Sequence, residues 1–511
     1  MTAGKSRIAP SNASRATRRG ALALGLAASL TACTISLDDE PRPGATGAPA
    51  PTSSAAAGLD SAGDPYVPGD GNGGYDVQHY KLTLDIRPGQ ATELNGVAEI
   101  TAKAARRLDR FHLDLTGLTV SEVTVDGAAA RWERRGSELI ISPSRAPAAN
   151  ARFTVKVRYA GTPKPVAKPP LGTYGWVRTS DGVFVACQPS GAHTWFPAND
   201  HPSDKATFEF VVTVPPGLTA IANGEPSGAP IGGGSGAPST GPGGGNGGVV
   251  PVAHRRAAPV TWRVKEPMAT YLATVTVGRF NVRTGKTPGG ITNITAVDPE
   301  VRTTDLDAFH AKNAEITEEF AELFGPYPFS STGGLVDNAE VGFALETQTR
   351  PVYGSFGAQE GIVAHEIAHM WFGDSVSVTS WKDIWLNEGF ATYAEWIWSE
   401  RVTGVSPQQQ FDQLYGQEDN DELWGVPTGD PGAEQMFSSG AVYTRGAMTL
   451  HALRTKVGDG VFFEILKTWT SRYRHSNATT AQFIAVAEQV SGQQLDGFFQ
   501  DWLYERGRPA R

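Results

Sequence analysis

The stretch that decides the fold runs from residue 362 to residue 395 and reads IVAHEIAHMWFGDSVSVTSWKDIWLNEGFATYAE. His365 and His369 are four residues apart, just over one helical turn, so both imidazoles project from one face of a helix. Two nitrogen ligands in this arrangement suit a tetrahedral zinc ion. The residues around the two histidines are mainly apolar, which predicts that this helix is buried in the core of a domain.

A catalytic zinc ion takes three protein ligands and keeps one position open for water. Glu388, with 18 residues between it and His369, is the candidate for the third ligand. Glu366 follows His365 directly and can reach a water molecule on the metal without being a ligand, as a general base must. The alternative is a chance match of five residues on a surface helix, which the correctly spaced Glu388 disfavours.

The composition is that of a soluble globular protein with about two to four domains. The chain has 511 residues, of which 40% are hydrophobic and 19% charged, and its formal net charge is −9. No basic patch rich in aromatic residues is present, so nucleic acid is not an expected partner.

The first 32 residues predict a signal peptide. Residues 1–19 carry five basic residues and no acidic one, and residues 20–32 are apolar but too few to span a bilayer. Leu30-Thr-Ala-Cys33 resembles a bacterial lipobox, so we expect an exported, cell-surface lipoprotein whose only membrane contact is a lipid anchor at Cys33. The alternative is an ordinary cleaved signal and a secreted protein; a weak twin-arginine match leaves the export route open.

The next 250 residues predict a tether and then an all-β domain. Residues 33–74 are rich in Pro, Gly, Ala, Ser and Asp and predict a flexible tether, with ordered structure beginning near Tyr75. Residues 75–285 alternate apolar and polar positions in short runs, which predicts a β domain interrupted by a disordered Gly/Pro insert at 224–248. The expected strands are 77–86, 95–102, 119–125, 153–159, 208–214 and 271–277.

From residue 286 to residue 511 the pattern is mainly helical, with a small sheet to which residues 334–341 contribute. Apart from the zinc helix and the Glu388 helix, the expected helices are 305–323, 440–456, 458–474, 479–491 and 494–505. Cys187 is expected to be a lone buried thiol. The fold class is therefore α+β with several domains.

The zinc motif resembles that of the aminopeptidase N family of gluzincin metallopeptidases, and further blocks match in the same order. These are Gln188-Pro-Ser with Trp195-Phe-Pro-Ala-Asn-Asp-His-Pro-Ser-Asp, Phe343-Ala-Leu-Glu-Thr, and Tyr443-Thr-Arg-Gly-Ala. The resemblance covers residues 75–509 and implies a short, two-domain bacterial form. It implies an N-terminal all-β saddle or sandwich domain followed by a mainly α thermolysin-like catalytic domain.

The resemblance also implies the roles of the site residues. One zinc ion per chain would be bound by His365, His369 and Glu388. Glu366 would be the general base and then the general acid, and the Tyr443 hydroxyl would stabilise an oxyanion. The substrate-binding residues would be Glu346, Gln188 and Ala344, with the first two holding the free α-ammonium group of a peptide. The implied protein is a monomeric zinc aminopeptidase acting on peptides with a free N-terminus.

Several alternatives stay open at this stage. Glu346 could instead pair with Arg350, Gln188 could make only a loop hydrogen bond, and Tyr443 could be a core residue. The whole chain could be a zinc endopeptidase or an inactive peptide-binding surface lipoprotein.

The remaining polar residues of the matching blocks have simpler interpretations. Asp374 and Asp383 either orient imidazoles or are solvated helix-end acids. His193 and His201 are interpreted as structural, and Lys382 and Glu395 as surface charges.

The chain also departs from the family pattern in two ways. Phe343, Leu345 and Thr347 replace the family's Gly, Met and Asn, which leaves the side-chain preference open. Family members usually continue into further domains, so a more open cleft is expected.

Overall fold

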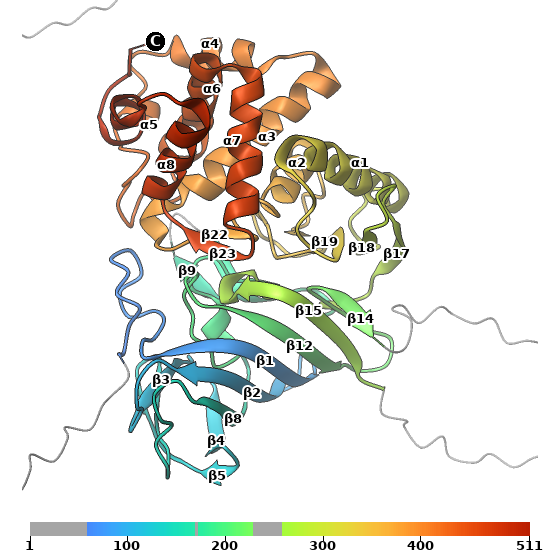
Figure 1. Ribbon diagram of the computed structural model, residues 1–511. Coiled ribbons are helices and arrows are strands. Elements are labelled where there is room, and N and C mark those ends of the chain that lie inside the picture. Colours follow the sequence, from blue (N-terminus) through green and yellow to red (C-terminus); the bar gives the residue numbers. More distant parts are fainter. Residues whose placement is uncertain (1–58, 169–171, 228–257, 511) are drawn as a thin grey trace, which may run out of the picture. The chain divides into compact units, whose positions relative to one another are not determined.

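The computed structural model describes residues 59–168, 172–227 and 258–510 (Figure 1). The predicted signal peptide, Cys33 and most of the predicted tether lie outside these residues. All described residues belong to one compact unit, with a β-rich part followed by a helical part, so the predicted fold class is confirmed. Within the described ranges, no helix is both long and apolar enough to cross a bilayer.

The β-rich part is built on an eight-stranded sheet of order β14-β15-β12-β1-β2-β8-β4-β5. Its strands are β1 (Tyr75–Ile86), β2 (Leu94–Ala104), β4 (Thr119–Val125), β5 (Ala128–Ala129), β8 (Arg152–Gly161), β12 (Lys205–Thr213), β14 (Glu225–Ser227) and β15 (Val260–Ala269). β1 pairs parallel with β12 and antiparallel with β2. Along β2 buried and more exposed residues alternate, because successive side chains point to opposite faces of the sheet.

Two smaller sheets complete the β-rich part, of orders β13-β16-β11-β10-β9 and β3-β7-β6. Their strands are β3 (Phe111–Asp114), β6 (Arg131–Arg135), β7 (Glu138–Ser142), β9 (Val166–Lys168), β10 (Gly172–Arg178), β11 (Val183–Ala186), β13 (Thr219–Ala222) and β16 (Val275–Gly278). Trp195 fills the space between two sheets, with ring centroids 6.3 Å from Trp176 in β10 and 6.5 Å from Phe210 in β12. This packing of sheet on sheet confirms a sandwich-like β domain.

The helical part contains a five-stranded sheet of order β17-β18-β19-β21-β20 and a two-stranded ladder of β22 with β23. The strands are β17 (Asn281–Lys286), β18 (Thr292–Val297), β19 (Ser331–Val336), β20 (Ala344–Leu345), β21 (Val352–Tyr353), β22 (Val376–Val378) and β23 (Ser476–Ala478). The α-helices are α1 (Leu306–Phe324), α2 (Glu360–Ala368), α3 (Trp385–Thr403), α4 (Pro407–Tyr415), α5 (Asp421–Trp424), α6 (Arg445–Val457), α7 (Asp459–Arg472), α8 (Thr480–Ser491) and α9 (Asp496–Phe499). In Figure 1, α1 runs beside β18 and β19. Phe309 of α1 packs on Tyr353 of β21, with 5.6 Å between ring centroids.

Most of the elements expected from periodicity are present within a few residues of their predicted bounds. The exception is the strand expected at 271–277, whose first part is a short helical turn, Thr270–Leu272, with β16 following. Cys187 is fully buried, as predicted.

Three expected boundaries differ from the structure. Residues 59–74, assigned above to the tether, include the buried Asp64 and Tyr66 and a β-bridge between Leu59 and Gly73, so order begins well before Tyr75. The segment lacks periodicity because its order comes from hydrogen bonds to distant residues rather than from a helix or a sheet.

The other two differences concern the insert and the domain boundary. The first residues of the predicted insert form β14, and residues 228–248 of it lie outside the described residues. β17 pairs with β18 in the sheet of the helical part, so that part begins a few residues before Lys286.

Candidate active site

The three predicted metal ligands lie together at the junction of α2 and α3. His365 is in the last turn of α2 and His369 is the residue that caps it, so the two rings lie 4.7 Å apart between centroids. The Oε2 atom of Glu388 lies 3.4 Å from Nε2 of His365 and 3.3 Å from Nε2 of His369. One ligand atom from each residue lies within 4.8 Å of the others, and all three side chains are buried.

Two glycines allow the helix of Glu388 to approach closely the helix that follows Tyr443. A Cβ atom on Gly389 in α3 would lie 2.9 Å from Cα of Gly446 in α6, and the reverse contact would be 2.8 Å. Both distances are shorter than packed carbon atoms adopt, so glycine is required at each position. Gly389 directly follows Glu388, and Gly446 is three residues after Tyr443. The close approach of the two glycines therefore brings Glu388 and Tyr443 to one site.

Both imidazoles are oriented with Nε2 toward Glu388. His369 Nδ1–H donates to the carbonyl oxygen of Phe372 at 2.9 Å, and His365 Nδ1–H donates to Oε1 of Glu395 at 2.5 Å. A hydrogen on each Nδ1 leaves each Nε2 as the atom that a metal ion would bind, in place of the proton that pairs it with Glu388. The interpretation of Glu395 as a surface charge is therefore wrong: it lies seven residues after Glu388, two helical turns along the same face of α3.

The charges of this cluster suit a divalent cation. Burial raises the pKa of Glu388, but the charges and hydrogen bonds of His369 and His365 outweigh burial and lower it to about 2. A buried, ionised carboxylate with two imidazole nitrogens is the His₂Glu donor set of a catalytic zinc site, in which the fourth position is open. The residues present therefore fit one zinc ion.

Glu366 lies next to this cluster with a free oxygen atom. Its carboxylate is buried, and Oε2 has no hydrogen-bond partner among the described residues. Burial raises the pKa of Glu366 to about 8, although the nearby His365 and His369 lower it in part. Glu366, Glu346 and His369 each place a ligand atom within 4.8 Å of the others. A carboxyl group whose pKa lies this close to neutral pH can both accept and donate a proton there, as general acid–base catalysis requires.

Glu346 and Gln188 meet across the two parts of the chain. Gln188, on the loop after β11, donates from Nε2 to Oε1 of Glu346 at 2.8 Å. Glu346 is buried, and burial is the main reason why its pKa is raised. Arg350 donates instead to the carbonyl oxygens of Ile294, Thr332 and Gly224, so the alternative ion pair with Glu346 is absent.

Ala344 lies on β20, two residues before Glu346, and β20 stands at the end of the strand order of its sheet. Ala344 pairs with Tyr353 of β21. An edge strand has backbone groups that can pair with an extended peptide.

Tyr443 lies in a π-helical turn, Ser439–Thr444, directly before α6. Its ring stacks on His365 with an interplanar angle of 13° and 5.9 Å between centroids. Burial, with the charges of Glu388, Glu346 and Glu366, raises the pKa of Tyr443 well above 10, so the hydroxyl group keeps its proton. A π-helical turn is a local irregularity often found at functional sites.

The remaining polar residues of the matching blocks are placed elsewhere. Asp383 accepts a hydrogen bond from Thr480, and Asp374 is buried without a side-chain partner among the described residues, so neither is solvated and neither bonds an imidazole. His193 bonds Asp200 and His201 bonds Asp64, as expected of structural histidines. Lys382 is exposed, as predicted.

Tyr271 was missed by the sequence analysis. It is buried, and Asn387 donates to its hydroxyl group at 3.5 Å. Burial, with the charge of Glu346, raises the pKa of Tyr271 well above 10. The tyrosine comes from the β-rich part, and no local pattern connects it with a site more than 70 residues away.

Two family descriptions match the chain. The Peptidase M1 N-terminal domain matches residues 76–229, and the Peptidase family M1 domain matches residues 353–502. The first match lies in the β-rich part and the second contains every zinc-ligand candidate and Tyr443. Together the two matches take in more than half of the chain.

Known aminopeptidases and a solved metallopeptidase are similar to this chain. Aminopeptidase M1-D of Oryza sativa subsp. japonica is 27% identical over 359 residues, 62% of this chain and 36% of that protein. Probable aminopeptidase 1 of Sulfurisphaera tokodaii is 24% identical over 471 residues, 85% of this chain and 53% of that protein.

A crystal structure of a mutant M1 zinc metallopeptidase from Deinococcus radiodurans, bound to a Tyr-Ser-Ala substrate, has a TM-score of 0.77 and 28% identity. It covers 88% of this chain and 99% of that one. The chain thus spans between about a third and a half of the two aminopeptidases, and nearly all of the solved structure.

Proposed function

The chain belongs to peptidase family M1, and we propose that it is a zinc-dependent aminopeptidase that releases N-terminal residues from peptides with a free N-terminus. The observation that carries the proposal is the position of Glu346, which Gln188 contacts at 2.8 Å and whose carboxylate lies within 4.8 Å of His369 and Glu366. A group that can bind an ammonium ion thus lies about one residue's length from the reacting groups.

One zinc ion per chain would be held by His365, His369 and Glu388. It would supply Lewis acidity toward the scissile carbonyl group and toward water. Glu395 and the carbonyl oxygen of Phe372 hold the two imidazoles in the tautomer that such a site needs.

Proton transfer falls to Glu366. Its partnerless Oε2 can accept a proton from the attacking water, and the protonated carboxyl group can then donate that proton to the leaving amine. Tyr443, whose phenol keeps its proton, can donate a hydrogen bond to the negative oxygen that develops on the carbonyl carbon.

Glu346 and Gln188 distinguish an aminopeptidase from a zinc endopeptidase. A buried carboxylate with a raised pKa gains a partner when a substrate ammonium group enters, because the pair forms a charge-assisted hydrogen bond in a dry site. An internal peptide bond offers no such cation. The retained Glu366, Glu388 and Tyr443 argue against an inactive peptide-binding protein.

The direct test compares aminoacyl p-nitroanilides with their N-acetylated forms, using the metal-loaded chain. We expect release of p-nitroaniline from the free-amine substrates only, and loss of that activity after chelation. Equal rates on both forms would support the endopeptidase alternative, and no turnover with zinc bound would support the binding protein.

We also propose that the enzyme is a monomer that acts outside the cytoplasm, anchored through a lipid on Cys33. The support is the lipobox-like Leu30-Thr-Ala-Cys33 after a basic and then apolar stretch. Labelling with radioactive palmitate should mark the full chain and not a Cys33→Ser variant. Equal labelling of the two proteins would contradict a lipid anchor at Cys33. Sedimentation would test whether the enzyme is a monomer.

A further inference from the structure

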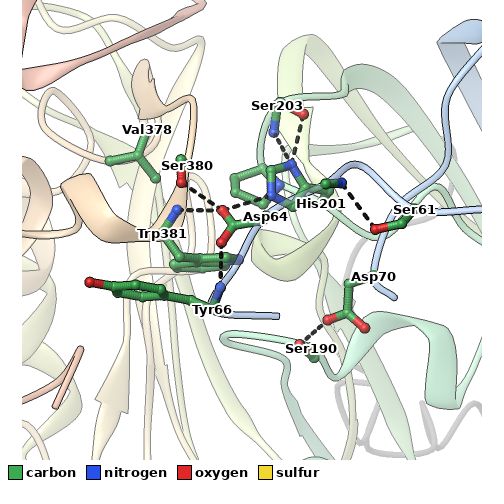
Figure 2. A network of polar contacts seen from close by, with 12 residues as sticks. Ser61, Asp64, Tyr66, Asp70, Ser190, His201, Ser203, Val378, Ser380 and Trp381 are labelled. Carbon is green, nitrogen blue, oxygen red and sulfur yellow. Dashed lines mark hydrogen bonds and ion pairs between the residues drawn. The ribbon is translucent and has the colours of Figure 1, made fainter. Parts of the chain in front are cut away.

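Residues 59–74 form a segment that we name the N-terminal strap. It has no helix or strand apart from the bridge of Leu59 with Gly73, yet it lies against both parts of the molecule. Figure 2 shows its polar contacts, with Asp64 between Trp381 and His201 and with Asp70 bonded to Ser190.

Asp64 joins the β-rich part to the turn before α3. Its Oδ2 atom accepts hydrogen bonds from the Trp381 backbone N–H at 2.8 Å, the Ser380 hydroxyl at 2.9 Å and His201 Nε2 at 3.2 Å. His201 donates from Nε2, because its Nδ1 accepts from the Ser203 backbone N–H. Burial raises the pKa of Asp64, but these hydrogen bonds and one from Tyr66 N–H outweigh burial and lower it to about 2.

Tyr66 joins the strap to the loop before the π-helical turn of Tyr443. Its ring is buried, and its hydroxyl group donates to Oδ1 of Asp430 and accepts from the Gly432 backbone N–H at 2.6 Å. The strap and this loop are more than 360 residues apart in the sequence, so no local structure can account for the contact.

The other end of the strap lies on the β-rich part. The Ser190 hydroxyl donates to Oδ2 of Asp70, and the Asn72 backbone N–H donates to Oδ1 of Asn199 at 2.5 Å. Ser190 is two residues after Gln188, on the same loop. The strap therefore contacts the loop that carries the β-rich part's contribution to the ammonium site.

Each contacted loop adjoins a residue of the proposed active site. Trp381 is seven residues before Glu388, and its ring lies 5.2 Å between centroids from that of Tyr271, whose hydroxyl group accepts from Asn387, the residue before Glu388. The candidate metal ligands lie on α2 and α3, both within the helical part. Gln188 comes from the β-rich part, so its contact with Glu346 depends on how the two parts are placed against each other.

We propose that Asp64 and Tyr66 are positioning residues that fasten the strap to the helical part. Through the hydrogen bond of Ser190 to Asp70, the strap then holds the Gln188 loop in register with Glu346, so that the ammonium site is formed before substrate binds. This inference rests on the proposed aminopeptidase activity. Pre-formed binding groups lower the cost of binding, so loss of the strap contacts should weaken substrate binding more than it slows the chemical step.

The test measures KM and kcat on a free aminoacyl p-nitroanilide for the full zinc-loaded chain and for Asp64→Asn and Tyr66→Phe. We expect KM to rise on the order of tenfold and kcat to change by less than about threefold, with zinc content unchanged. Asp60→Asn makes the same carboxylate-to-amide change on an exposed side chain of the strap and should leave both parameters unchanged.

A double-mutant cycle separates positioning from stability. In a Gln188→Ala background, Asp64→Asn and Tyr66→Phe should raise KM little further, because the group that they position is gone. A lower melting temperature with unchanged KM, or equal increases in KM in both backgrounds, would overturn the inference. If Asp64→Asn does not fold, Tyr66→Phe decides alone. An inactive wild type would instead count against the proposed function.

Discussion

The proposed metal-binding corner and the proposed amine-binding corner of the site are built in different ways. His365, His369 and Glu388 come from two helices that follow each other in the chain, and their contacts span at most 23 residues. Gln188 and Glu346 are 158 residues apart and come from the two parts of the molecule. The comparison teaches that the groups proposed for the chemistry are brought together by local structure, whereas the groups proposed for substrate recognition are brought together by tertiary structure.

The two corners also differ in how their surroundings shift the pKa of the carboxyl group that each one contains. At the metal corner Glu388 faces two imidazoles, and its pKa is lowered to about 2. At the amine corner burial raises the pKa of Glu346, and Gln188 supplies only a neutral donor. The first corner is suited to a resident cation, and the second to a cation that arrives with the substrate.

The largest effect is expected at the metal corner, from Glu366→Gln. The amide cannot accept a proton, so kcat should fall on the order of 10³-fold, while zinc content stays at one ion per chain because Glu366 is not a ligand. Glu434→Gln is the matched control, since that side chain is exposed. Substantial turnover by Glu366→Gln, measured with a free-amine anilide, would remove Glu366 as the base.

At the amine corner, Glu346→Ala should raise KM by about 10- to 100-fold, the worth of one hydrogen bond to a charged group. The fall in kcat should be smaller than for Glu366→Gln, because the reacting groups remain. In the same variant, the ratio of the rate on free substrates to the rate on N-acetylated substrates should fall. A wild-type KM in Glu346→Ala would mean that Glu346 has a structural role, and the proposed difference between the two corners would be wrong.

Much of the metal corner was predictable from sequence, because helical spacing and apolar flanks determine where His365, His369 and Glu388 point. Glu395 was misinterpreted although its spacing of seven residues from Glu388 was visible, since a charged residue on a helix is more often solvated. Tyr271 and the strap could not be found in this way. Their roles depend on no periodic pattern and on partners far away in the sequence, 116 residues for Tyr271 and Asn387 and more than 360 for Tyr66.

A smaller effect is expected from Glu395→Ala. Loss of the carboxylate that holds His365 Nδ1–H should weaken zinc binding by about tenfold, at the low end of the usual range because Glu395 is partly exposed. Competition with a chelator of known affinity measures this. Glu395→Gln, which keeps an acceptor oxygen, should recover part of the loss, and wild-type affinity in Glu395→Ala would show that Glu395 does not support the metal corner.

The smallest effect on activity is expected from His193→Gln in the β-rich part, since this side chain belongs to neither corner. Burial lowers the pKa of His193, but the hydrogen bond and charge of Asp200, with the charges of Asp114 and Asp70, raise it to about 9. Because the pKa of His193 is higher in the folded protein than the unfolded value of about 6.5, protonation of His193 stabilises the fold. This stabilisation is fully present below pH 6.5 and is lost as the pH rises through 9.

Denaturant titrations at two pH values check this prediction. His193→Gln should cost on the order of 1–2 kcal/mol at pH 6 and less at pH 9.5, with KM unchanged. An equal cost at both pH values would mean that His193 is not protonated in the folded protein.

The most direct measurement is a crystal structure of the full chain with a bound free amino acid, with anomalous scattering recorded at the zinc edge. The account predicts one anomalous peak bonded to His365 Nε2, His369 Nε2 and the carboxylate of Glu388, at about 2.0–2.2 Å. It also predicts the ligand's amine nitrogen against Glu346 and Gln188. A metal bound elsewhere, or an amino acid whose amine avoids Glu346, would contradict the account.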